Sequence, residues 1–289
     1  MESSTTKEKA EIMKGPIVLL DESLKLFYKK IWTYIVLELI PFIPLLLLAV
    51  VVIAFLIGGV GLEITGLIVP QAASFLLTLI FIFLIVLSVL SFIVLQLLSI
   101  IGIILITKDN EKDIGLKEIY KAAWKKLLPF LWLAIISYFL LIGAYLFFII
   151  PGILFGIWFF FSTFVLVCED KRGVKAILKS KEYVHKKWWA VFGRLLFMVF
   201  IIGIFAVMLE FGSFVFSFFD FLSFVFSIVV TPILFIYYYL MYEDIKSLKQ
   251  ENLSKKETIW PYLIISILGY LIAVAIISLL AVPFIRTLI

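Results

Sequence analysis

Three polar residues lie within or at the edge of long apolar runs, where an ionisable side chain is costly and is by default a functional candidate. Glu38 lies inside the first run, Gln96 inside the second and Arg194 near the start of the fifth. Glu38 could serve an ion, a proton or a substrate, or it could simply reach the interface near Lys30. Gln96 fits an interhelical hydrogen bond. Arg194 could snorkel to the interface, or pair with Glu38 or with Glu169-Asp170. Together these three residues form the candidate intramembrane polar site.

The residue pattern gives little support to catalysis. The single histidine, His185, lies in a basic run with only Glu182 as a nearby carboxylate, so we expect a surface side chain rather than a general base. The single cysteine, Cys168, excludes an internal disulfide. Metal-ligand spacing, a phosphate-binding loop, a dinucleotide fingerprint and a nucleophile elbow are all absent from the sequence. We therefore expect no catalytic residue, no metal and no cofactor.

Two acidic pairs, Glu169-Asp170 and Glu243-Asp244, come at the ends of apolar runs. Paired carboxylates can carry out acid–base work, but lysines follow each of these pairs immediately. This arrangement favours a salt-bridged rim.

The stretch from Cys168 to Arg194 indicates where the chain sits. After a turn at Gly173, apolar residues recur with helical spacing and lysines fall on the opposite face, which is typical of an amphipathic interfacial helix. Lysine clusters beside membrane spans attract anionic lipid, and tryptophans gather at the same level. The candidate anionic-lipid-binding residues are Lys125, Lys126, Lys175, Lys179, Lys186, Lys187, Trp188 and Trp189.

The composition is that of an integral membrane protein. Hydrophobic residues make up 64% of the 289 residues and charged residues only 16%, with a mean hydropathy of +1.21. The apolar runs exceed the ~20 residues that a helix needs to cross a bilayer. The net charge of +5 is divided among short clusters beside these runs, which argues against nucleic acid as a partner. We expect an all-α, polytopic helical membrane protein.

The runs divide the chain into a polar N-terminus, residues 1–16, and a single membrane domain, residues 17–289. The N-terminus has no pattern of a cleavable signal peptide. Pro41 and Pro44 should kink the first span. The second is too long for one upright crossing at 1.5 Å per residue, so it should protrude, tilt or begin with an interfacial segment. The seven expected spans are about 31–57, 70–107, 127–149, 152–168, 190–209, 221–242 and 259–284.

Charge predicts the orientation. If the odd-numbered spans run outward, all but one of the 25 Lys and Arg residues fall on one side or at its edge, the exception being Arg286. The positive-inside rule then places the N-terminus in the cytoplasm and the C-terminus outside the cytoplasmic (plasma) membrane.

Three charged stretches, beginning at Glu111, Glu169 and Glu243, align without gaps as Glu-x-x-x-small-apolar-Lys. Each is followed by a lysine pair and then by a span. The pattern favours a repeated unit, an amphipathic cytoplasmic helix followed by a membrane hairpin, although lysine-flanked entries are also common in polytopic proteins. Parallel repeats would imply pseudo-rotational symmetry about the membrane normal.

Three passages occur in a notable order: residues 149–153 (IIPGI); Gly173 with a lysine-rich helix ending in Trp188-Trp189-x-x-Phe192-Gly193; and Thr231-Pro232-Ile233 leading to three tyrosines and Glu243-Asp244. This order resembles a bacterial and archaeal family that includes the membrane domain of glycerophosphoryl diester phosphodiesterases and uncharacterised inner-membrane proteins. The resemblance covers about residues 110–250 and implies a membrane architecture of about six spans, so a seventh departs from it. In that family the phosphodiesterase activity belongs to a separate soluble barrel, and the resemblance carries over neither this activity nor any site residue.

The leading hypothesis is a non-enzymatic membrane module that binds lipids, through anionic headgroups, or partner proteins, including copies of itself. The alternative is a transporter or channel subunit with a polar path near Glu38. A membrane-embedded enzyme comes third, because the spans lack a cluster of His, Asp or Ser.

Overall fold

The computed structural model describes residues 13–65, 71–112, 114–248 and 258–286, and all regular secondary structure in these parts is helical, without a strand. Within them, seven helical stretches are long and apolar enough to cross a membrane, which confirms the all-α polytopic fold. The stretches are Ile31–Gly58, Phe75–Lys108, Leu116–Phe147, Ile149–Glu169, Val174–Ser213, Phe218–Ser247 and Trp260–Ala281. Nearly all of the polar N-terminus, residues 1–12, lies outside the described residues.

The first helices are separated by short breaks. The amphipathic helix α2 (Pro16–Lys29) packs its buried face on α11, and Lys30 separates it from α3 (Ile31–Leu39). A 3₁₀ turn, Ile40–Phe42, then leads into α4 (Ile43–Thr65). Pro41 lies in this turn and has no N–H to continue the α-helical ladder. The predicted proline break in the first span is confirmed.

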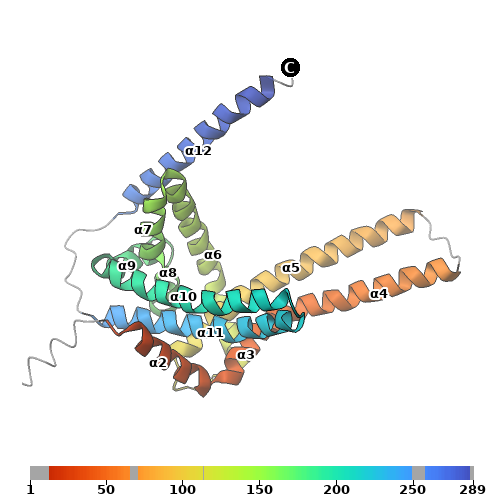
Figure 1. Ribbon diagram of the computed structural model, residues 1–289, viewed down its shortest axis with the longest axis horizontal. Helices are drawn as coiled ribbons and strands as arrows, with labels where there is room; N and C mark the ends of the chain where they lie inside the picture. Colours follow the sequence, from red (N-terminus) through yellow and green to blue (C-terminus); the bar gives the residue numbers. More distant parts are fainter. Residues whose placement is uncertain (1–12, 66–70, 113, 249–257, 287–289) are drawn as a thin grey trace, which may run out of the picture.

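The second span is a single helix, α5 (Gln71–Lys108), of 38 residues. At 1.5 Å per residue it is about 57 Å long, well beyond the ~30 Å hydrocarbon core. It packs beside α4, and the two extend together away from the rest of the molecule (Figure 1). The excess length therefore remains within one helix and does not form a separate interfacial segment.

The third and fourth spans form a hairpin. α6 (Leu116–Phe147) joins the predicted amphipathic stretch and span in one helix that continues through Pro129. The chain turns at Phe148, where the backbone is extended, and continues as α7 (Ile149–Phe159) and α8 (Ser162–Glu169). The break expected between the spans 127–149 and 152–168 is thus slightly late, because Pro151 lies in the first turn of α7, where proline is tolerated.

The basic stretch forms α9 (Val174–Val184), followed by a 3₁₀ turn, His185–Lys187. The apolar face of α9, with Ala176, Ile177 and Val184, is buried against α7 and α8. The predicted amphipathic helix is therefore present, and contacts with α7 and α8 hold it in place.

The last three helices are α10 (Trp188–Ser213), α11 (Phe218–Ser247) and α12 (Trp260–Arg286). α10 and α11 lie side by side. α12 packs against α6, and its far end extends away from the other helices (Figure 1).

Small residues make the contact between α12 and α6. A Cβ atom added to Gly143 would lie 2.6 Å from the Ser266 Cβ, and one added to Gly269 would meet the Gly143 carbonyl oxygen. The Ser266 hydroxyl donates to the Leu140 carbonyl oxygen at 2.8 Å. Close backbone approach with a hydroxyl bond to a neighbouring carbonyl is typical of helix contacts in membranes.

The predicted repeat holds in part. Gly115 and Gly173 each immediately precede a helix, but the aligned Ser247 is the last residue of α11. A break separates α9 from α10, whereas α6 runs uninterrupted through Lys125-Lys126. The repeated units therefore differ in geometry. The last lysine pair, Lys255-Lys256, lies outside the described residues.

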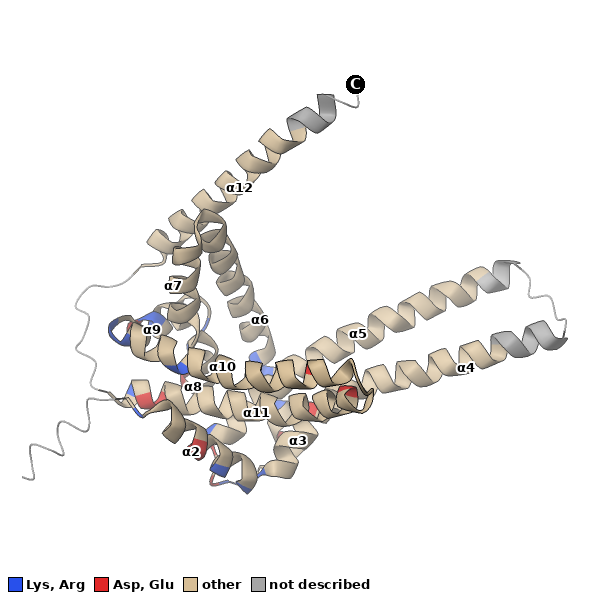
Figure 2. Cartoon of the chain, viewed as in Figure 1, with Lys and Arg blue, Asp and Glu red and all other residues tan. Residues whose placement is uncertain are grey.

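Lys and Arg gather around α2, α9 and the adjoining start of α6 (Figure 2), whereas residues 43–58 of α4 and 260–281 of α12 include no charged residue. The apolar helices α4 and α12 thus extend away from the end of the molecule where the basic residues gather.

Candidate functional site

A cleft of about 430 Å³ opens on the molecular surface between the start of α6 and the turn that follows α8. Its charged side chains are those of Glu118, Lys121, Lys125, Lys126, Asp170 and Arg172. Four cations against two carboxylates leave a surplus of two positive charges. We name this feature the basic cleft; its electrostatic balance suits an anion.

Helical geometry places the lysines of one wall. Lys121 and Lys125 are four residues apart on α6 and so share a face. Ile119, Ala123 and Leu127 of the same helix are buried, which fixes the opposite face against the protein. The lysines are held at the cleft because the apolar side of α6 is packed.

A glycine turn supplies the other wall. Asp170 caps α8 in the left-handed conformation, with φ of 56°, and Gly173 has φ of 53° and ψ of −130°. A Cβ at Gly173 would be strained by that backbone and would also lie 3.3 Å from the Trp132 indole. The turn therefore lies close against α6, and Arg172 is held at the cleft.

Asp170 organises the charges of the basic cleft. Its carboxylate lies 3.1 Å from the Lys126 Nζ and 3.6 Å from an Arg172 guanidinium nitrogen. The hydrogen bond from Lys126 and the two positive charges hold the pKa of the Asp170 carboxyl below its usual range. Within the described part of the chain, Lys121 and Lys125 form no ion pair. These two lysines are available to an incoming anion.

The exposed face of α6 continues from the lysines as an aromatic and apolar strip. Trp124 is 61% exposed, Leu128 78% and Trp132 59%. The three follow Lys121 at helical spacing, toward the middle of the span. A row of charges that continues into exposed Trp and Leu side chains has the polarity of a phospholipid, with its headgroup at one end and its acyl chains along the helix.

The structure divides the eight lipid-binding candidates. Lys125 and Lys126 line the basic cleft. Lys175 is exposed on α9, whereas Lys179 is engaged by Glu182 at 2.7 Å. The remaining four lie in the 3₁₀ turn and at the start of α10: Lys186, Lys187, Trp188 and Trp189.

Two of the four cations that line the basic cleft, Lys121 and Arg172, were not among the lipid-binding candidates. Lys121 could have been found, because it lies one helical turn before Lys125. Arg172 could not, because its place depends on how the turn at Gly173 lies against Trp132.

Two members of the predicted intramembrane polar site, Glu38 and Gln96, lie together. The Gln96 Nε2 donates to the Glu38 Oε2 at 3.4 Å, between α3 and α5. Glu38 is only 3% exposed, so it does not reach the interface. The second oxygen of each side chain, Oε1, is buried and has no hydrogen-bond partner.

Arg194 lies elsewhere, and the predicted pairing with Glu38 or with Glu169-Asp170 is wrong. Its guanidinium donates to the backbone oxygens of Met13 and Lys14, at 2.9 and 2.8 Å. The segment before α2 runs beside α10 and offers these carbonyls, which an arginine fork can satisfy. Arg194 therefore secures the start of the described chain.

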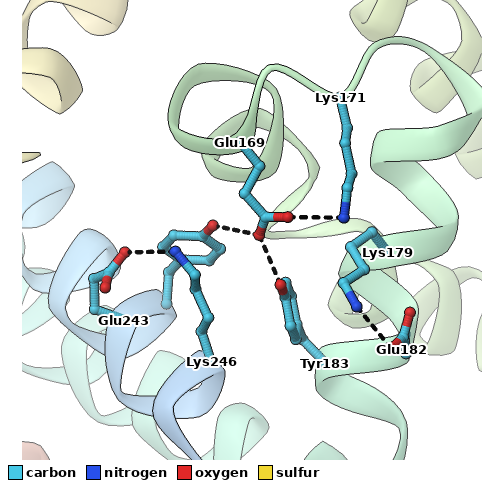
Figure 3. Close-up of polar contacts among 8 residues, drawn as sticks. Glu169, Lys171, Lys179, Glu182, Tyr183, Glu243 and Lys246 are labelled. Carbon is cyan, nitrogen blue, oxygen red and sulfur yellow. Dashed lines mark hydrogen bonds and ion pairs between the residues drawn. The ribbon is translucent and has the colours of Figure 1, made fainter. Parts of the chain in front are cut away.

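Hydrogen-bond donors surround a second carboxylate, that of Glu169 (Figure 3). The hydroxyls of Tyr183 and Tyr242 both donate to its Oε1 at 2.7 Å, and the Lys171 Nζ lies 2.9 Å from its Oε2. These residues belong to α8, α9, α11 and the connecting turn, so one side chain joins four parts of the chain. The rim predicted for Glu169-Asp170 is present as ion pairs, but nothing in the residue pattern pointed to the two tyrosines.

The fold and the basic cleft define a multi-pass helical membrane protein with a positively charged cleft at the end of its spans. Within the residues that the structure describes, no three His, Cys, Asp or Glu side chains gather as a possible metal site. Comparison of the chain with protein-family models, curated proteins and solved structures finds no match. The family resemblance seen in the sequence therefore stays a prediction.

Proposed function

We propose that this protein is a non-enzymatic module of the plasma membrane that binds the anionic headgroups of phospholipids in the basic cleft. The observation that carries the proposal is the surplus of positive charge beside the exposed strip of Trp124, Leu128 and Trp132. Lys and Arg near a membrane surface each contribute about 1 kcal/mol to the binding of anionic lipid. The Arg172 guanidinium adds a planar fork suited to a phosphate.

The distribution of charge supports the orientation in this proposal. Lys and Arg gather at the end of the molecule that holds the basic cleft (Figure 2). With that end in the cytoplasm, by the positive-inside rule, the N-terminus is cytoplasmic and the C-terminus lies outside. The basic cleft then faces the leaflet that is richer in anionic lipid.

The test measures phospholipid adducts of the purified full chain by native mass spectrometry in a neutral detergent, with phosphatidylglycerol against phosphatidylcholine. The double variant Lys121→Glu/Lys125→Glu reverses the charge of one wall and should reduce phosphatidylglycerol adducts at least tenfold. Binding of phosphatidylcholine should not change.

The matched control is Lys25→Glu/Lys29→Glu, which changes the net charge equally but acts on two exposed lysines of α2. It should leave phosphatidylglycerol binding within about twofold, since each exposed charge acts only within a Debye length. An equal loss in both double variants would mean that lipid responds to net charge, and the basic cleft would lose its role.

Transport is the second candidate function, and the burial of Glu38 favours it, because ionisable residues inside spans often mark ion or proton paths. Proton or cation flux into proteoliposomes, abolished by Glu38→Gln, would support this function. Equal flux in the variant would remove it.

A further inference from the structure

The surroundings of Glu38 contain almost nothing that could stabilise a negative charge. Gln96 faces it from α5, and the Tyr120 hydroxyl of α6 is the titratable group close enough to sense its charge. The α11 residues that pack on this part of α3 are apolar: Val229, Ile233 and Ile236. Within the described residues, Glu38 has no ion pair with a Lys or Arg.

The Glu38–Gln96 pair lacks one hydrogen-bond donor. The Gln96 amide already donates to one oxygen of Glu38, and both remaining Oε1 atoms lack a donor. A carboxylic acid and an amide can form a ring of two hydrogen bonds, in which the amide N–H donates to the acid carbonyl and the acid O–H donates to the amide oxygen. A proton on the Glu38 Oε1 therefore lets this atom donate to the Gln96 Oε1, so that both unpaired oxygens gain a hydrogen bond. The same proton also removes a buried charge.

We propose that Glu38 and Gln96 form a proton-binding site, in which Glu38 is a neutral carboxylic acid paired with the Gln96 amide at neutral pH. A metal cation fits less well, since hard cations take about six oxygen ligands and this pair leaves two oxygens without a partner. This site is independent of the basic cleft and of lipid binding.

The place of the site in the fold gives the proton a structural role. Glu38 is followed closely by the 3₁₀ turn at Ile40–Phe42, where the first span changes from α3 to α4. Loss of the proton would place a charge between α3, α5 and α6, next to a point where the helical ladder is already interrupted. Deprotonation should therefore loosen the packing of α3 on α5.

The experiment is infrared spectroscopy of the full chain in lipid nanodiscs, comparing the wild type with Glu38→Gln. The C=O stretch of a neutral carboxylic acid lies apart from the carboxylate and amide bands. At neutral pH the wild type should show this band and Glu38→Gln should lack it. A difference spectrum that contains only carboxylate bands would overturn the proposal.

Two controls separate this site from the rest of the chain. Glu169→Gln should leave the acid band unchanged, because Glu169 accepts hydrogen bonds as a carboxylate. Gln96→Leu should keep the band but shift it toward the position of an acid without a hydrogen-bond partner. An acid band that is unmoved by Gln96→Leu would show that the amide is not the partner.

The last comparison is between infrared spectra recorded in sodium chloride and in choline chloride. Loss of the acid band in sodium but not in choline would assign the site to an alkali cation and overturn the proposal. An acid band equal in both salts, and lost only as the pH rises, supports a proton as the ligand.

Discussion

Glu169 and Glu38 are the same side chain in two environments. Glu169 receives two tyrosine hydroxyls and a lysine from three parts of the chain, with 15% of its side chain exposed. Glu38 receives one long bond from Gln96 and is nearly sealed off. A carboxyl supplied with donors is stable as an anion, whereas one without them is more stable as a neutral acid. The number of donors, more than depth in the protein, separates a structural carboxylate from a candidate proton site.

The largest expected effect is that of Glu169→Ala. The Tyr242 side chain is fully buried, so its hydroxyl and that of Tyr183 would lose their acceptor, at a cost of about 3 kcal/mol in the free energy of unfolding. Unfolding by denaturant in detergent measures it. Glu243→Ala, which breaks an exposed ion pair with Lys246, is the control and should change stability by no more than about 0.5 kcal/mol. Similar losses in the two variants would remove the structural role of Glu169.

The same substitution at both positions sharpens the comparison. Glu169→Gln exchanges charge-assisted bonds for neutral ones, which are roughly half as strong, and should cost about 1 to 2 kcal/mol. Glu38→Gln replaces an acid by an amide that can make the same two bonds to Gln96, so its cost should stay below about 0.5 kcal/mol. Thermal unfolding in one detergent compares the two variants directly. A larger loss at Glu38 than at Glu169 would contradict the difference between the two sites.

A small, pH-dependent effect is expected at an exposed carboxylate, Asp170. Its depressed pKa means that its ion pairs stabilise the fold above the ordinary Asp range, near pH ~4, and that this stabilisation is lost as the pH falls through the lower, folded-state pKa. The pair with Lys126 is solvent-screened and should contribute less than about 1 kcal/mol. Stability curves against pH for the wild type and Asp170→Asn measure it, and the two should converge in acid. A gap that widens in acid would reverse the assigned sign.

The sequence predicted the spans well, because long apolar runs with lysine flanks leave few alternatives in a membrane. Pro41 likewise predicted the break in the first span. The lysine flank at Lys125-Lys126 was misleading, since it suggested a boundary where α6 is continuous. A lysine can extend its charged end to the interface from within a helix, so a charge cluster need not mark a helix end.

Contacts between distant segments could not be predicted in this way. Arg194 binds the backbone of Met13 and Lys14, about 180 positions away, and a backbone oxygen leaves no trace in the residue types. Tyr242 and Glu169 meet across 73 positions, and neither residue type by itself identifies the other as its partner. Glu38 and Gln96 were each singled out as polar residues in apolar runs, but only their geometry showed that they face each other with oxygens left unpaired.

The contact of Gly143 with Ser266 and Gly269 has a consequence for biogenesis. Synthesis proceeds from the N-terminus, so α6 is already in the bilayer when α12 leaves the ribosome. In the two-stage view of membrane folding, spans insert first and associate afterwards. The glycines of α6 and α12 then allow α12 to pack closely on a helix that is already in the membrane.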